Sequence, residues 1–213
     1  VLGETPEMTL FLALNRIREE QDPSLMFDFV CRAGVCGSCG MIVNGILRMA
    51  CSTLTKDLSP LIRLIPMPLF KMLGDLSVDT GTWFRRLNMK TKAWLHSSRD
   101  FDPAAAETPM SNADALKIYE AERCIECGLC VACCPTARTR DGFVGAAGMN
   151  RIARFLIDPR DRRSRQDYIQ IVGTDEGTFG CFETIACEDH CPLELPLDDR
   201  LEYIRDVLAN AGT

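Results

Sequence analysis

Three cysteines lie within nine residues near the start of the chain, in the stretch CRAGVCGSCG from Cys31 to Gly40. With one distant cysteine they form the arrangement Cys31-x4-Cys36-x2-Cys39 followed by Cys51, the plant-type ferredoxin spacing for a 2Fe-2S cluster. Four thiolates must reach one small inorganic core, so the backbone has to fold around it. Glycine accepts positive φ and lets the backbone approach closely, and the loop contains Gly34, Gly37 and Gly40. We therefore predict a cluster-binding loop.

Residues 40–50, GMIVNGILRMA, predict the element that returns Cys51 to this loop. Asn44-Gly45 is a strong two-residue hairpin turn between two short apolar strands. A structural zinc site is the alternative, but zinc favours paired C-x2-C motifs or mixtures of cysteine and histidine. A phosphate-binding loop needs a Lys-Ser/Thr pair after its glycines, and none follows Gly40. The 2Fe-2S interpretation is the one we retain.

A second group of cysteines follows the bacterial ferredoxin pattern. It is the run Cys124-x2-Cys127-x2-Cys130-x3-Cys134-Pro135. In this pattern the fourth cysteine ligates the other cluster of a two-cluster domain, so a partner run should follow and return one cysteine to the first cluster. Such a run is present, and it ends in Cys191-Pro192. Cross-ligation predicts a 4Fe-4S cluster held by Cys124, Cys127, Cys130 and Cys191.

The partner run, Cys181-x5-Cys187-x3-Cys191, lacks one cysteine of the pattern. When the two runs are aligned on their Cys-Pro ends, Thr184 stands where the middle cysteine would be. A threonine hydroxyl is a hard ligand with a high pKa compared with a thiolate, so we expect this site to lack one iron. The third cluster is predicted to be 3Fe-4S, held by Cys134, Cys181 and Cys187.

Three features near these runs receive simpler interpretations. Using Cys133 as a ligand would break the x3 spacing, so we interpret it as a spare buried thiol. His190, between two predicted ligands, could relay a proton or tune a potential, but a solvated or capped histidine is the plainer alternative. The glycine-rich residues 142–148 could mimic an anion site, yet a packed turn before a helix accounts for them.

Composition limits the class of protein. Twelve cysteines in 213 residues require a disulfide framework, zinc or iron-sulfur clusters. No charged segment followed by an apolar one opens the chain, so no secretion signal points to an oxidising compartment. The formal net charge of −6 argues against nucleic acid as a partner.

The most apolar stretch, residues 61–70, is interrupted by Arg63, Pro66 and Pro68. A bilayer requires about 20 apolar residues, so we expect no transmembrane segment. Any membrane contact is expected to run through a partner protein.

The remaining sequence predicts two domains of an α+β chain. Residues 9–20 carry Leu10, Leu14 and Ile17 at helical spacing, and residues 61–65 predict a short strand. Together with the hairpin they indicate a small mixed domain over residues 1–95, whose first strands we expect to be missing from this chain. Residues 97–109 are rich in alanine, serine, proline and acidic side chains, which indicates a linker or a long surface loop.

The second domain, residues 96–213, is predicted to be mainly helical. Ser111-x-x-Asp114 is typical of a helix start. Further helices are expected over residues 147–157 and 197–208. In the last of these, one apolar stripe is predicted to face the core; it comprises Leu197, Leu201, Ile204 and Leu208.

Five segments, in this order, resemble the iron-sulfur subunits of the succinate dehydrogenase and fumarate reductase family. They are CRAGVCGSCGMIVNG, DLSVDTGTWF, CIECGLCVACCP, GFVGAAGMNRIARFLIDPRD and the C-x5-C-x3-C-P end. The likeness covers essentially the whole chain and is greatest to quinol:fumarate reductases with a dihaem anchor. It implies a β-grasp ferredoxin domain followed by a helical dicluster domain, with the 2Fe-2S cluster nearest a flavin and the 3Fe-4S cluster nearest a quinone.

The resemblance also implies partners. These are a flavoprotein subunit with FAD, where the dicarboxylate chemistry takes place, and a membrane-anchor cytochrome b with haem b and menaquinone. The chain would then lie on the cytoplasmic face of a bacterial inner membrane, bound through the anchor.

The residues themselves indicate electron transfer and no catalytic group. The chain has no dinucleotide fingerprint or nucleophile elbow, and its histidines are His96 and His190. Three clusters in series imply a one-electron relay between a two-electron donor and a two-electron acceptor on other chains. We expect an electron-transfer subunit of quinol:fumarate reductase. The alternatives are a succinate dehydrogenase subunit working in the reverse direction, a soluble ferredoxin-like carrier, and a zinc-based interaction module.

Overall fold

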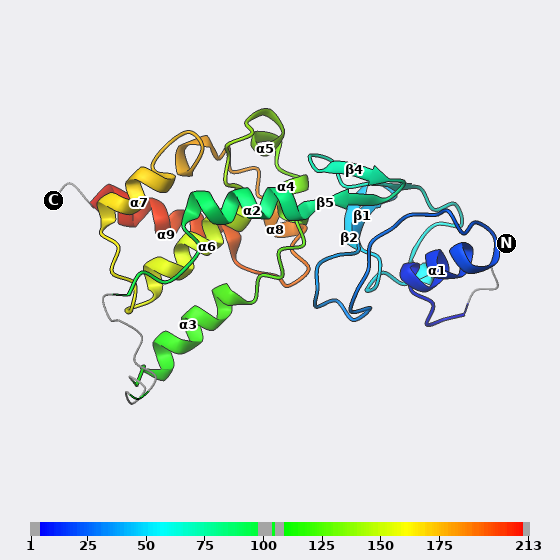
Figure 1. The fold of residues 1–213 in the computed structure, drawn as a ribbon, viewed down its shortest axis with the longest axis horizontal. Helices are drawn as coiled ribbons and strands as arrows, with labels where there is room; N and C mark the ends of the chain where they lie inside the picture. Colours follow the sequence, from blue (N-terminus) through cyan, green and yellow to red (C-terminus); the bar gives the residue numbers. More distant parts are fainter. Residues whose placement is uncertain (1–4, 98–103, 105–108, 211–213) are drawn as a thin grey trace.

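The computed structural model describes residues 5–97, 104 and 109–210. Figure 1 shows an elongated molecule with the strands and helix α1 at one end and the longer helices at the other. The predicted linker, residues 97–109, lies largely outside the described residues. Within the described part, no helix has the length and apolar character needed to cross a membrane.

Helix α1 (Leu10–Glu20) begins where the sequence predicts it. The Thr9 hydroxyl caps it by accepting a hydrogen bond of 3.2 Å from the Leu12 amide, which satisfies one of the free donors of the first turn. Leu10, Phe11 and Leu14 are buried on one face of the helix. Their burial anchors α1 in the core of the strand-containing half.

The predicted hairpin is present. Strands β1 (Gly40–Val43) and β2 (Ile46–Met49) pair antiparallel, and Asn44 and Gly45 both have positive φ, of 49° and 88°. That combination is the type I′ turn, whose twist matches the paired strands. The predicted strand over residues 61–65 is shorter in the structure, because β3 (Leu64–Ile65) pairs with β1 only beyond Arg63. The sheet order is β2-β1-β3.

A second hairpin and a helix follow that the sequence patterns do not predict. Strands β4 (Lys71–Gly74) and β5 (Ser77–Asp79) form a two-stranded sheet, which leads directly into α2 (Thr80–Thr91). The Asp79 carboxylate caps this helix by accepting from the Thr82 amide at 2.9 Å. Helix α2 packs against α6 and α7 of the helical half. It therefore joins the two halves, and the predicted domain boundary at residue 95 stays a prediction.

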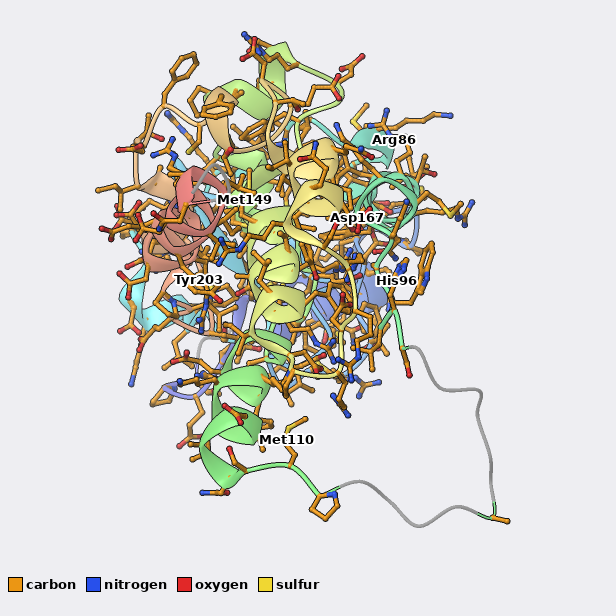
Figure 2. All side chains as sticks on the ribbon, turned by 90° about the vertical axis from the view of Figure 1, so that its left-hand side faces the viewer. Arg86, His96, Met110, Met149, Asp167 and Tyr203 are labelled. Atoms are coloured by element: carbon orange, nitrogen blue, oxygen red, sulfur yellow. The ribbon has the colours of Figure 1, made fainter. Side chains whose placement is uncertain are left out.

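The helical half is built around α6. Its elements are α3 (Asn112–Glu122), α4 (Leu129–Ala132), α5 (Pro135–Thr139), α6 (Gly145–Ile157), α7 (Arg165–Val172), α8 (Ala186–Asp189) and α9 (Leu197–Ala209). Ile152 and Ala153 at the centre of α6 are fully buried, and α2, α3, α4 and α9 pack around it. Figure 2 shows α6 in the middle of the helices, with Tyr203 on one side and His96 on the other.

The helices predicted here agree with the structure within two residues at each end. Helix α3 is capped by the Ser111 hydroxyl, which accepts from the Asp114 amide at 3.1 Å. Of the predicted apolar stripe of α9, Leu197, Leu201 and Ile204 are at most 5% exposed, whereas Leu208 is only partly buried against the core. The expected packed turn before α6 is also present, since Val144 is buried and Gly145 has a positive φ of 63°.

Candidate iron-sulfur centres

The loop between residues 31 and 51 directs backbone amides at all four predicted sulfur ligands. The sulfur of Cys51 accepts from the Gly34 amide at 3.2 Å, and that of Cys31 accepts from two amides of the loop. The sulfurs of Cys36 and Cys39 accept from the amides of Cys31 and Cys51, at 3.4 and 3.5 Å. Amides directed at sulfur stabilise thiolates and the added electron of a reduced cluster. The hairpin β1–β2 returns Cys51 to this loop as expected.

The pKa values of two of these thiols diverge. Burial raises the pKa of Cys36, but hydrogen bonds from the Ser38 hydroxyl and backbone and from the Cys31 amide outweigh it and lower that pKa to about 6. Cys39 is 2% exposed, and burial raises its pKa to about 12. Metal binding must displace the proton of such a buried thiol. Hydrogen bonding thus favours the thiolate form of Cys36, whereas burial disfavours it at Cys39.

The second predicted ligand set lines one cavity. Cys124, Cys127 and Cys130 come from the loop that precedes α4 and from α4 itself, whereas Cys191 follows α8. Apolar side chains, including those of Ile125, Pro192 and Leu195, complete the wall. The fold thus brings a cysteine from 61 residues downstream to the first three, as cross-ligation requires.

The third predicted ligand set lines a different cavity, and Thr184 is part of its wall. Cys134 precedes α5, Cys181 follows a short 3₁₀ turn, and Cys187 lies in α8. All three line this cavity together with Thr184. The structure therefore places three thiols and one hydroxyl around a common space, in the arrangement that the sequence alignment of the two runs predicts.

The donor chemistry of both cavities fits iron-sulfur clusters. Burial, with a further contribution from neighbouring thiols, raises the pKa of Cys127 to about 11 and that of Cys187 to about 11. The pKa of Cys130 is raised well above its usual value for the same reasons. Thiols crowded in this way deprotonate together only when metal cations compensate their charge. Among the described residues, no three His, Cys, Asp or Glu side chains are placed to hold a single metal ion.

Cys133 and His190, which the sequence left outside the ligand sets, each contact the backbone of a nearby helix. The Cys133 thiol donates to the Cys130 carbonyl at 3.3 Å and is absent from the described walls of both cavities. It is half-buried, whereas a buried thiol was expected. Nδ1 of His190 lies 2.8 Å from the Ala186 carbonyl, so the imidazole donates to the backbone of α8.

An ion-pair group beside the second cavity was not predicted. Arg151 of α6 pairs with Glu126 and also donates to Asn88 of α2. The guanidinium favours the thiolate form of Cys124, whose pKa is nevertheless raised by burial. The signal available in the sequence was Glu126, a charged residue between two predicted ligands.

Comparison with known proteins agrees with this geometry. Residues 2–85 match the model of a 2Fe-2S iron-sulfur cluster binding domain, and residues 120–195 match a 4Fe-4S dicluster domain. The fumarate reductase iron-sulfur subunit of Wolinella succinogenes is 50% identical over 96% of this chain and 86% of its own length. The succinate dehydrogenase iron-sulfur subunit of Bacillus subtilis is 29% identical over 90% of this chain and 78% of its own.

A solved structure shares the fold. It is the Mycobacterium smegmatis Sdh1 complex in the apo form, in which the matching chain has a TM-score of 0.83 and 26% identity. The match covers 98% of this chain and 87% of that one. The predicted order, a 2Fe-2S ferredoxin domain followed by a helical dicluster domain, is confirmed. The chain belongs to the family of succinate dehydrogenase and fumarate reductase iron-sulfur subunits, the electron-transfer subunits of these oxidoreductase complexes.

Proposed function

We propose that this chain carries electrons, one at a time, from a quinol oxidised in a membrane-anchor subunit to the FAD of a fumarate-reducing flavoprotein subunit. The 50% identity to a fumarate reductase subunit over 96% of the chain supports this direction. The succinate dehydrogenase direction is the alternative, supported by a 29% identical relative. The dicarboxylate chemistry belongs to the flavoprotein, and no residue of this chain is proposed to be catalytic.

The ligand assignment is part of this proposal. Cys31, Cys36, Cys39 and Cys51 would hold the 2Fe-2S cluster, Cys124, Cys127, Cys130 and Cys191 the 4Fe-4S cluster, and Cys134, Cys181 and Cys187 the 3Fe-4S cluster. When bound, the clusters supply one-electron redox chemistry. The observation that carries the proposal is the cavity lined by three thiols and Thr184, because a hydroxyl in place of the fourth thiolate favours a three-iron centre.

An exposed apolar surface supports the membrane-anchor partner. Phe182 and Ile185 line the same cavity as Thr184, yet they are 70% and 47% exposed, and Phe179, three positions before Phe182 in the sequence, is 68% exposed. Large apolar side chains gathered on one exposed face typically mark a protein interface. We infer that this face contacts the anchor, where menaquinone and haem b would be bound. The chain would then sit on the cytoplasmic face of the inner membrane.

Metal analysis of the purified complex tests the assignment. The ligand sets predict about nine irons per chain and a three-iron electron paramagnetic resonance (EPR) signal in the oxidised state. A reproducible count near ten without that signal would contradict the role of Thr184. Zinc without acid-labile sulfide would indicate an interaction module, and a free monomer without flavin or haem partners would indicate a soluble carrier.

The direction of electron flow needs its own measurement. We expect the complex to couple menaquinol oxidation to fumarate reduction faster than it couples succinate oxidation to quinone reduction. The opposite ratio would assign it to the succinate dehydrogenases. Both assays use the same preparation, so differences in assembly cancel.

A further inference from the structure

The two cysteine-rich loops of the separate halves touch through their backbones at Gly37. A Cβ atom built on Gly37 would lie 2.6 Å from the carbonyl oxygen of Ile125, 2.9 Å from Cα of Cys127 and 3.0 Å from its nitrogen. Ordinary contacts of a Cβ atom lie at 3.4–4 Å. All three neighbours are main-chain atoms, so no side-chain rotation can make room. Any side chain at this position must therefore push the loops apart, by about 0.8 Å for the Ile125 oxygen to reach the nearest ordinary contact distance.

This contact joins two proposed ligand sets. Gly37 directly follows Cys36 and precedes Cys39 by two positions, and its neighbour across the contact is Cys127 itself. Two other glycines extend this contact between the halves. The Cβ position of Gly40 lies 3.1 Å from the Leu129 side chain, and that of Gly128 lies 2.8 Å from the Phe70 ring. The strand-containing half and the helical half thus meet where their proposed clusters would be neighbours.

We propose that Gly37 is a positioning residue for electron transfer between the 2Fe-2S and 4Fe-4S sites, because its missing side chain sets their separation. The inference rests on the ligand assignment of the proposed function. In each transfer one site loses an electron and the other gains it, and no bond or proton moves. The rate of electron tunnelling falls exponentially with separation, so a displacement of the loops slows this step without altering either ligand set.

Gly34 provides a matched control. Gly34 and Gly37 lie in the same loop and have the same positive φ of 76°. A side chain is strained in that region of backbone space, and this strain is common to Gly34→Ala and Gly37→Ala. Around Gly34, however, no described atom lies within 4 Å of the Cβ position. The difference between the two variants therefore isolates the contact between the loops.

The experiment uses the intact complex in three forms: wild type, Gly34→Ala and Gly37→Ala. EPR power saturation measures how much a reduced 4Fe-4S centre accelerates the spin relaxation of the 2Fe-2S centre, an interaction that weakens with the cube of their separation. We expect this acceleration of relaxation in wild type and in Gly34→Ala. In Gly37→Ala we expect a weaker acceleration, with the EPR signals of both clusters retained. Menaquinol-linked fumarate reduction should fall further in Gly37→Ala than in Gly34→Ala, which shares the backbone strain and keeps the amide that donates to the Cys51 sulfur. Reduction by a dye that feeds the flavin directly should persist in both variants.

Several outcomes would overturn the inference. One is a Gly37→Ala complex with the relaxation and menaquinol-linked rate of Gly34→Ala. If Gly37→Ala loses iron, the wild-type complex alone still tests the inference. In wild type, a 2Fe-2S spin relaxation that does not change when the 4Fe-4S cluster is reduced would show that the two clusters are not close together. Absence of either signal from the wild-type complex would instead refute the ligand assignment, and so the proposed function itself.

Discussion

Replacing Asp161 by asparagine is expected to loosen the helical half at its most buried ion pair. The side chains of Asp161 and Arg163 are only 2% and 4% exposed. Their two parallel hydrogen bonds measure 2.7 Å from Nη2 to Oδ2 and 3.0 Å from Nε to Oδ1. Asp161 also accepts from the Tyr168 hydroxyl at 3.1 Å and from the His96 amide at 3.3 Å. The hydrogen-bonding capacity of the carboxylate is thus satisfied by donors from several parts of the helical half.

Arg163 extends the same network to α2. Its Nη1 donates to the carbonyls of Thr91 and Lys92 at 3.2 and 3.3 Å, where α2 ends. The guanidinium also lies over the rings of Phe155 and Tyr168, 4.5 and 4.8 Å from their centroids. The pair therefore fastens the end of α2 to α6 and α7, and α6 contributes Met149 to the wall of one proposed cluster cavity and Ala147 to the wall of the other.

The size of the effect follows from burial. Asparagine has nearly the shape of aspartate but no charge, so it leaves a buried guanidinium uncompensated, which costs about 3–5 kcal/mol. At about 1.4 kcal/mol for each factor of ten, the local opening equilibrium should rise by roughly a hundredfold to several-thousandfold. The control is Glu20→Gln in the pair with Arg16, whose side chains are 53% and 43% exposed. That change should cost only about 0.3–0.5 kcal/mol.

Hydrogen–deuterium exchange on the intact complex measures this opening. It reports local stability, which suits a chain with bound clusters, whose unfolding is not two-state. Amides at the end of α2 and in α7 should lose protection in Asp161→Asn and keep it in Glu20→Gln. Equal protection of these amides in both variants would show that the ion pair does not hold this junction.

The pH dependence of the same exchange has a definite sign. Burial raises the pKa of Asp161, but hydrogen bonds from Arg163 and the His96 amide outweigh it and bring that pKa below the usual 3.8. A carboxylate whose pKa is lower in the folded than in the unfolded state stabilises the fold at pH values above its unfolded pKa. This contribution is lost as the pH falls through its folded pKa. After correction for the intrinsic exchange rate, the difference in opening free energy between wild type and Asp161→Asn should be constant near neutral pH. It should shrink only below pH 3.8.

Three substitutions test the proposed cluster sites. Thr184→Cys supplies a fourth thiolate, so the three-iron EPR signal should disappear and quinol-linked activity should fall, while dye-linked activity persists; an unchanged signal would contradict the vacant corner. Cys133→Ser should retain all three cluster signals, and loss of either C-terminal signal would show that the ligand register is wrong. Arg151→Gln removes a cation beside Cys124, so an EPR redox titration should show a lower 4Fe-4S potential; an unchanged value would mean that Glu126 already neutralises Arg151.

The proposed ligand sets could be predicted because spacing defines each set, and a single vacancy, at Thr184, distinguishes the third. Cys191 is distant from Cys124 in sequence, yet the rule that the last cysteine of each run crosses over predicts that they share a cluster, and both line one cavity. Thr184 was identified by counting back from a Cys-Pro pair, and it lines the other cavity. Such patterns are fixed by the geometry of a small inorganic core, which depends little on the surrounding fold.

Helix α2 and the β4–β5 hairpin were not predicted because tertiary contacts stabilise them more than their own patterns do. In α2, the buried apolar residues are Trp83, Phe84 and Leu87, too few for a clear helical period. Its stability comes from packing against α6 and α7, which a local pattern does not reveal. The turn of the hairpin places Asp75 at a φ of 43° without the Asn-Gly or Asp-Gly pair that marked the first hairpin.

Gly34 and Gly37 show the limit of reading a motif by itself. The loop requires positive φ at both positions, and that requirement alone explains why each is glycine. Sequence reasoning therefore gives the two residues the same role and has no reason to look further. In the folded chain only Gly37 meets a second backbone, which arrives from residues 88 to 90 positions later in the sequence. The local explanation is sufficient for Gly34 and incomplete for Gly37, because a small side chain at 37 would have to displace a proposed cluster ligand of the other half.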